Sequence, residues 1–145
     1  MSQRPDVMEL KESMSALAER IANEGFAKKL DYSLESVHEV EAILAVLHNE
    51  YVKTHSEEGI HGIALEFGAY LVKLIERHFG PVDWSRDHAD FGQDAFPLVW
   101  RGRTLFPVTW CLKRIIDGPS DNVWSKFQVL VLEENAHDQT KRCQY

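Results

Sequence analysis

Cationic and indole side chains gather in one stretch of fifteen positions, from 100 to 114. An arginine can bind a carboxylate or phosphate through two parallel hydrogen bonds, and an indole can stack on a cation or fill an apolar pocket. Tryptophan and arginine also anchor protein interfaces more often than other residue types. The alternative is that the tryptophans pack a core and the arginines are solvated. The candidate binding surface consists of Trp100, Arg101, Arg103, Trp110, Lys113 and Arg114.

Carboxylates gather in the first sixty residues, which hold 12 Asp and Glu against 6 Lys and Arg, in a chain of net charge -7. Phosphate backbones need cations, so we expect no nucleic-acid ligand. An acidic helical surface attracts a basic protein partner instead, although such charge can also serve solubility alone. The candidate acidic face consists of Glu35, Glu39, Glu41 and Glu50.

Residue patterns of catalysis are missing from the sequence. There is no G-x-S-x-G or S-x-x-K nucleophile motif and no G-x-x-x-x-G-K phosphate loop. Cys111 lies between Trp110 and Leu112, which is typical of a buried structural thiol, and Cys143 lies in a polar tail. We expect no catalytic residue and no cofactor, and the sequence favours a protein that is not an enzyme.

Metal binding is the other chemistry that the sequence raises, because the chain has 7 histidines. No two of them stand four positions apart, whereas a tetrahedral zinc site needs converging ligands. One loop rich in oxygen ligands could hold a hard cation, but its order is not that of an EF-hand. We interpret this loop as solvated and expect no metal. Its polar residues are Asp83, Asp87, His88, Asp90 and Asp94.

The first eighty residues predict three helices, because apolar residues recur at steps of three and four. The first begins at the cap Asp6 and stops at Gly25, the second begins at the cap Ser33, and the third ends at Gly80. In the first helix we expect an inward stripe of Val7, Leu10, Met14, Leu17 and Ile21. In the second helix the expected stripe is Val37, Val40, Leu44, Leu47 and Tyr51, and Ile43 and Val46 widen it. In the third helix the expected inward residues are Ile60, Ile63, Phe67, Tyr70 or Leu71, and Leu74.

Strands are predicted after residue 80, where all four tryptophans lie. Residues 82–85 form a short strand, and residues 96–100 and 103–106 flank a hairpin turn at Arg101-Gly102. Arg101 and Arg103 are two positions apart, so both should point to one face. We expect Trp84 and Trp124 in the core.

The C-terminal part predicts one or two further helices. Pro107 can take the first helical position before residues 108–117, and Ser120 or Asp121 caps a last helix. The expected fold is α+β: three N-terminal helices, then a small antiparallel sheet with one or two C-terminal helices. A chain of 145 residues predicts a single domain, which we place at residues 1–134, followed by a polar, flexible tail at residues 135–145.

Glycines accompany the third helix, although an interior glycine costs about 1 kcal/mol relative to alanine. Gly59, Gly62 and Gly68 lie in or beside its pattern. We expect them to allow close packing by another helix or the sheet, and the alternative is a ligand that approaches the backbone.

Several short pieces between residues 60 and 130 resemble an uncharacterised family of small bacterial proteins, known as a domain of unknown function. The resemblance implies a small bacterial domain of helices and sheet, and it brings no activity, cofactor or catalytic residue. Some related small acidic bacterial proteins act as immunity partners of toxins. The pieces that carry the resemblance are Phe67-Gly68-Ala69-Tyr70-Leu71, Gly80, Trp84, Phe106-Pro107 and Lys113-Arg114-Ile115-Ile116-Asp117-Gly118.

Three functional hypotheses follow. The first is a non-catalytic module that binds a protein partner, with an immunity or accessory role in a toxin system as its concrete form. The second is a sensor or enzyme that binds a small anion between Arg101, Arg103, Lys113 and Arg114. The third is a structural homo-oligomer, such as a dimer, that pairs through the first helix.

The sequence has no apolar run of about 18 residues and no apolar signal core, so we expect a cytoplasmic protein without a membrane partner.

Overall fold

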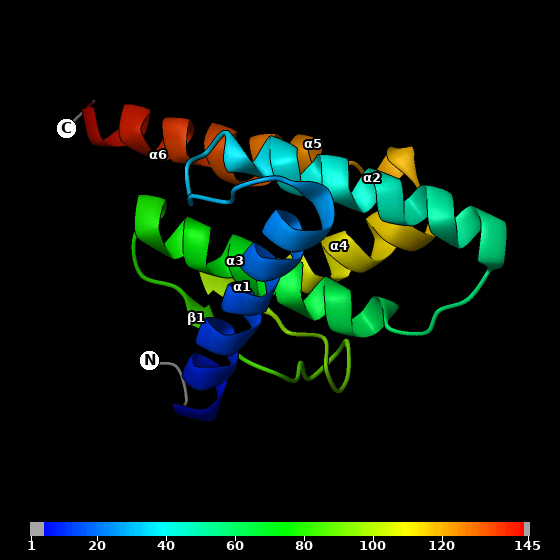
Figure 1. The fold of residues 1–145 in the computed structure, drawn as a ribbon. Helices are drawn as coiled ribbons and strands as arrows, with labels where there is room; N and C mark the ends of the chain where they lie inside the picture. The colour runs from blue at the N-terminus through cyan, green and yellow to red at the C-terminus, as the bar shows by residue number, and fades with distance from the viewer. Residues whose placement is uncertain (1–4, 144–145) are drawn as a thin grey trace.

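A computed structural model describes residues 5–143, with the side chains of residues 6–140. The fold is α+β, as predicted: three N-terminal helices, a three-stranded antiparallel sheet and C-terminal helices (Figure 1). The elements in chain order are α1 (Pro5–Phe26), α2 (Ser36–Thr54), α3 (Ile60–Phe79), β1 (Asp83–Trp84), β2 (Leu98–Trp100), β3 (Arg103–Leu105), α4 (Pro107–Ile116), the 3-10 turn η1 (Pro119–Asp121), α5 (Val123–Phe127), the π-helical turn η2 (Gln128–Leu132) and α6 (Glu133–Cys143).

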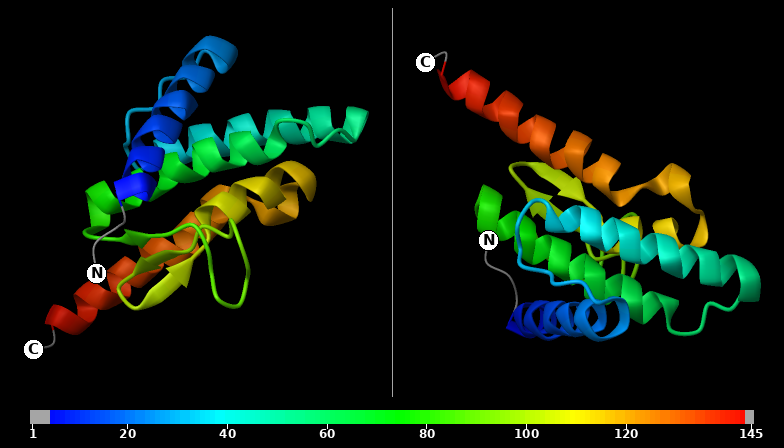
Figure 2. Two further views of the ribbon diagram at one scale, coloured as in Figure 1. Left: turned by 90° about the horizontal axis from the view of Figure 1, so that it is seen from below. Right: turned by 45° about the horizontal axis from the view of Figure 1, so that its top comes forward.

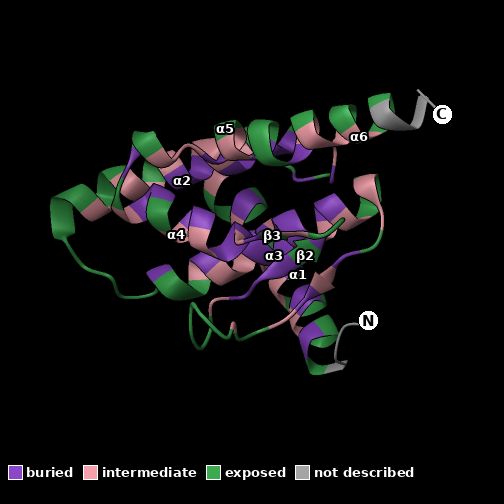
Figure 3. Ribbon diagram, turned by 180° about the vertical axis from the view of Figure 1, so that it is seen from behind, coloured by how far each residue is buried: buried purple, intermediate pink, exposed green. Residues whose placement is uncertain are grey.

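The central element is α3, which packs against α1 on one side and α4 on the other (Figure 2). Helix α2 contacts α4 and α5, and its Ser36 Oγ shares a hydrogen bond with the Tyr70 hydroxyl of α3. The N-terminal helices, the sheet and the C-terminal helices share one apolar core, whose buried positions face inward in Figure 3. The largest fully buried side chains come from both halves of the chain and include Trp84, Trp100, Tyr70, Phe67 and Phe127.

Helix α1 buries Val7 as predicted, but the rest of its buried stripe differs from the prediction. Small and polar residues face α3, while Leu10, Met14 and Ile21 flank the contact and Leu17 is half-exposed. Small side chains let two helix backbones approach closely, so the close contact selected them over the larger apolar residues. The buried stripe consists of Val7, Lys11, Ser15, Ala18 and Ala22.

Helix ends follow the predicted chemistry at some positions and not at others. Ser33 Oγ accepts the Ser36 amide, but α2 begins only at Ser36, and its N-cap residue is Glu35, which makes no side-chain cap hydrogen bond. Helix α1 continues through Gly25 to Phe26, and Ala27 takes the left-handed φ of 53° instead of the glycine. The last helix is capped by Asn122, whose Oδ1 accepts the Ser125 amide, and not by Ser120 or Asp121. In α2, the predicted inward position Val46 is exposed.

The hairpin turn is confirmed at Arg101-Gly102, and its strands are shorter than the predicted residues 96–100 and 103–106. Trp100 pairs with Arg103 across a two-residue turn in which Arg101 has φ 51° and Gly102 has φ 75°. Two positive φ angles define the turn that matches the twist of hairpin strands. Strand β1 pairs with the opposite edge of β2, so β2 is the central strand.

The C-terminal end differs from the flexible tail that the sequence predicted. Residues 133–143 form α6, which continues directly from α5 and η2. Its polar composition gives no apolar stripe, so no periodic signal marked it as a helix. What holds α6 is a set of bonds to the hairpin, described below.

Gly68 is the glycine of α3 that close packing requires. A Cβ at this position would lie 2.5 Å from Val108 Cγ2 and 2.7 Å from Val108 Cα. The first turn of α4 therefore rests directly on the backbone of α3. Gly62 has nothing within 4 Å of such a Cβ. Close packing is thus confirmed at Gly68 and not at Gly62.

We expect Gly68→Ala and Gly62→Ala to change stability in opposite directions. Gly68→Ala should lower the free energy of unfolding by about 1–3 kcal/mol, because the new methyl group forces the Val108 backbone away. Gly62→Ala should raise it by about 0.5–1 kcal/mol, because alanine favours an exposed helix interior. Urea unfolding followed by circular dichroism measures both. A Gly68→Ala variant as stable as Gly62→Ala would contradict the close contact of α3 with α4.

Candidate functional site

Arg101 and Arg103 bind α6, and both point to the same side as predicted. Arg103 donates to both carboxylate oxygens of Asp138, at 3.2 and 3.1 Å, and pairs with Glu134 at 3.0 Å. Arg101 donates to Asp138 at 3.2 Å and to Asn135 Oδ1 at 2.9 Å. These charge-assisted bonds attach α6 to the hairpin. The arginines are therefore occupied by the protein itself.

Trp100 lies beneath these arginines and is fully buried. Its Nε1 donates to the Phe79 carbonyl oxygen at 3.2 Å, and Arg101 donates to the same oxygen at 2.9 Å. The guanidinium carbons of Arg101 and Arg103 lie 4.6 and 5.6 Å from the centroid of the Trp100 ring. Cation–π stacking on a core indole explains this part of the candidate binding surface as structure.

Arg114 and Glu41 form an ion pair inside the molecule. Arg114 Nε lies 2.8 and 3.1 Å from the two Glu41 oxygens, and both side chains are largely shielded from water. Glu41 Oε1 also accepts the Val123 amide at 2.9 Å, at the start of α5. The pair thus joins α2, α4 and α5. Arg114 is therefore no longer part of the candidate binding surface, and Glu41 is no longer part of the candidate acidic face.

Trp110 and Lys113 line a pocket of about 650 Å³ between α4, the loop at residues 86–97 and the α5–η2 segment. We call it the cationic pocket. Trp110 forms part of its wall, while Lys113 is exposed at its edge. The four cations predicted to share a small-anion site therefore do not converge: two bind α6, one binds Glu41 and one lies at this pocket. The lining residues are Phe91, Gln93, Asp94, Ala95, Phe106, Thr109, Trp110, Lys113, Lys126 and Leu130.

Three members of the candidate acidic face stay on the outside of α2. Glu35 and Glu50 are exposed, and Glu39 is half-exposed with Lys28 Nζ at 2.7 Å. Val46, which is 47% exposed, lies seven positions after Glu39 and four before Glu50. That spacing puts Glu39, Val46 and Glu50 on one side of the helix.

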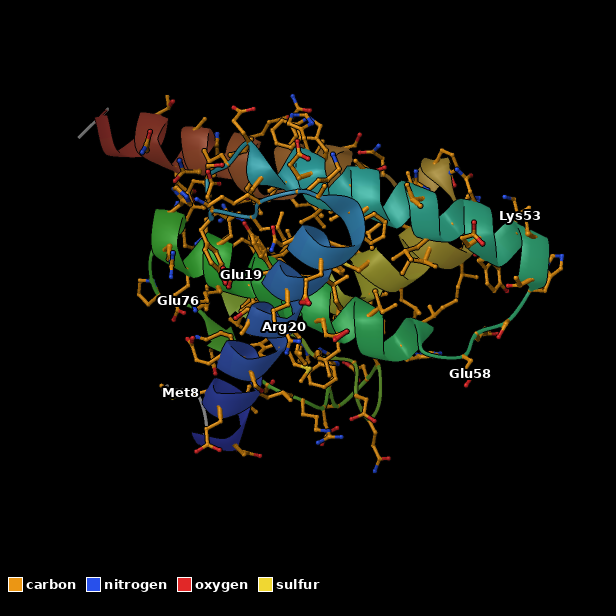
Figure 4. The ribbon with its side chains drawn as sticks, in the orientation of Figure 1. Met8, Glu19, Arg20, Lys53, Glu58 and Glu76 are labelled. Atoms are coloured by element: carbon orange, nitrogen blue, oxygen red, sulfur yellow. The ribbon has the colours of Figure 1, made fainter. Side chains whose placement is uncertain are left out.

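A groove of about 470 Å³ opens beside Glu50, where α2, α3 and the end of α4 meet. We call it the acidic groove. Figure 4 labels Glu58 and Lys53 at this end of the molecule, where α2 leads into α3. Its floor is apolar, and the rim carries the carboxylates of Glu50 and Glu58. The lining residues are Leu47, Glu50, Tyr51, Thr54, Ser56, Glu58, Ile60, Ile63 and Ile115.

Cys111 and the acidic loop have structural roles. Burial raises the pKa of the Cys111 thiol, so the reactive thiolate is disfavoured. In the loop, His88 Nδ1 accepts the amides of Asp90 and Phe91, and Arg86 Nε lies 2.6 Å from Asp94. Across the described residues, no group of three or more His, Cys, Asp or Glu converges on a common metal position. The thiol of Cys143 lies outside the described side chains.

Comparison with protein-family models, curated proteins and solved structures gives no match to this chain. The resemblance drawn from the short sequence pieces therefore stays a prediction. None of the helices within residues 5–143 is long and apolar enough to cross a lipid bilayer.

We expect Glu41→Ala to lower the free energy of unfolding by about 3–5 kcal/mol, because Arg114 would remain buried without its counter-charge. The Glu41→Gln/Arg114→Met double variant removes both charges and keeps a carbonyl oxygen for the Val123 amide, so its loss should be smaller. Chemical denaturation of the three proteins measures both effects. A Glu41→Ala variant within about 0.5 kcal/mol of wild type would refute a structural role for this pair.

We expect Asp138→Asn to loosen α6 while α3 keeps its protection, as measured by amide hydrogen exchange. Glu133→Gln is the matched control, because Glu133 is exposed and makes no ion pair with a described side chain. Equal exchange of α6 in both variants would show that Asp138 does not hold it.

The attachment of α6 to the hairpin through Asp138 should depend on pH. Hydrogen bonds from Arg103 and then Arg101 lower the pKa of Asp138 from its ordinary value. Its stabilising contribution is therefore complete above the unfolded-state pKa of about 3.9 and is lost as the pH falls through the lowered pKa. Wild-type α6 should lose protection in that acidic range, whereas α6 of Asp138→Asn should not show this step.

Proposed function

We propose that this protein is a non-catalytic binding module that holds a basic segment of a protein partner in the acidic groove. The observation that supports the proposal is the combination of an apolar floor with an acidic rim at one hollow. The floor supplies a hydrophobic contact, and the rim supplies the preference for positive charge.

The floor is built by side chains from three helices. Ile60 and Ile115 are buried at its base, while Leu47, Tyr51 and Ile63 are half-buried and keep part of their surface open to solvent. One inserted aliphatic side chain would cover that surface and gain about 1.5–3 kcal/mol on full burial. Apolar anchors of this size are typical of helical segments that lie in grooves.

The rim is acidic on two sides. Glu50 extends from α2 and Glu58 from the loop before α3, and Glu57 lies next to Glu58. Lys53 offsets part of this charge, with its Nζ 3.8 Å from Glu50, but both side chains are largely exposed and their pairing is weak. The remaining negative charge favours lysine or arginine beside the apolar anchor of the partner.

An immunity or accessory role in a toxin system is one instance of such binding. A basic partner that carries its functional residues on the bound segment would be blocked by the contact itself. The groove indicates a basic segment with an apolar anchor, and experiment has to identify the partner that carries it. Partner capture should therefore be compared between variants.

Reversing the charge of the rim should abolish binding of a basic amphipathic probe. The probe is a helical peptide of leucine and lysine, and its counterpart carries glutamate in place of lysine. We expect the lysine peptide to shift the amide NMR signals of groove residues, less so at high salt, and the glutamate peptide to shift none. Glu50→Lys/Glu58→Lys should weaken binding of the lysine peptide at least about tenfold.

The matched control is Glu9→Lys/Glu24→Lys, which changes the net charge equally at two exposed positions of α1. It should bind the lysine peptide as wild type does. Native partners should be captured from cell extract by wild type and by this control, and lost with the groove variant. Equal losses in both double variants would mean that net charge alone attracts the probe, which contradicts a specific groove.

A further inference from the structure

The cationic pocket has walls of a kind suited to an apolar or aromatic ligand. Phe91 and Phe106 meet edge to face with ring centroids 5.2 Å apart, and Trp110 and Leu130 complete the apolar surface. Phe91 is nevertheless 69% exposed, and Leu130 is 37% exposed. Aromatic surface left open beside a hollow marks a binding site more often than a scattered surface residue does.

The loop that carries Phe91 is held in shape by its own bonds. His88 and Gly92 exchange two backbone hydrogen bonds of 2.9 Å, which closes a tight turn around Phe91. The His88 ring also lies 4.9 Å from Phe91 and 5.7 Å from Phe106, measured between centroids. The wall is thus formed before a ligand arrives, which reduces the entropy lost on binding.

The charges around the pocket leave one cation without a partner. Asp94 binds Arg86 at 2.6 Å, and Lys126 Nζ binds Asp121 at 2.9 Å. Lys113 is exposed and makes no ion pair with any side chain of residues 6–140. Among the charged side chains that line the pocket, Lys113 is thus the one that no opposite charge offsets. One uncompensated ammonium group selects one negative charge on a ligand.

We infer that the cationic pocket binds a small monocarboxylic acid with an aromatic or branched apolar body. The body lies against Phe91, Phe106 and Trp110, and the carboxylate pairs with the ammonium group of Lys113. A volume of about 650 Å³ is within the range of small-molecule sites. This site shares no residue with the acidic groove and stands independently of the proposed function.

The test compares 3-phenylpropionate with its neutral amide, 3-phenylpropionamide, by amide NMR titration. Both should shift signals of the pocket residues, and the amide should bind about five-fold more weakly because it lacks the ion pair. Lys113→Gln should remove this difference, whereas Lys29→Gln, at an exposed position outside the pocket, should keep it. Phe91→Ala should weaken the acid and the amide alike.

Several results would overturn the inference. They are equal binding of acid and amide to wild type, shifts that lie outside the pocket, and a preference for the acid that survives Lys113→Gln. Binding of a peptide with a C-terminal phenylalanine, but not of 3-phenylpropionate, would assign the pocket to a protein terminus instead. The Glu50→Lys/Glu58→Lys variant should bind 3-phenylpropionate as wild type does, so failure at either site is distinguishable from failure at the other.

Discussion

The buried ion pair between Glu41 and Arg114 fixes the position of α4, on which both candidate sites depend. Helix α4 supplies Ile115 to the acidic groove and Trp110 and Lys113 to the cationic pocket. Separating the two residues would leave a charge buried without its partner, so the pair holds together the helices that carry it. On its other side, α4 rests on the backbone of α3 at Gly68. Two close contacts thus hold the one helix that both hollows share.

The sequence predicted the elements whose signals are local. The helices follow from apolar spacing, and the hairpin follows from an Arg-Gly turn, because each pattern reflects the geometry of neighbouring residues. Features set by distant residues were missed. Helix α6 is held by arginines about 35 positions before it, and no pattern within its own polar sequence could show that. Beyond Val7, the buried face of α1 was mispredicted because its size pattern favoured the large residues, whereas the contact with α3 buries Ser15, Ala18 and Ala22.

At the candidate sites too, local features could be predicted from the sequence, whereas contacts between distant residues could not. Composition marked Trp110, Lys113 and Glu50 as candidate binding residues, and the structure places each of them beside a hollow. Composition could not show which of the other charges neutralise each other. Glu41 and Arg114 are 73 positions apart, and only the fold reveals that they cancel. The sequence does contain one signal for the pocket that was not used for the prediction. Phe91 is a large aromatic residue in a polar loop, followed by Gly92, and such a residue seldom serves only to keep a loop solvated.

The two hollows share no lining residue, and one carries Glu50 and Glu58 whereas the other carries Lys113, so we expect them to fill independently. The most direct test is one NMR titration in which the lysine peptide and 3-phenylpropionate are added in turn to the same wild-type sample. We expect two separate sets of shifted signals, at the groove and at the pocket, with neither ligand displacing the other. Peptide shifts spread over all exposed carboxylates, or competition between the two ligands, would contradict it.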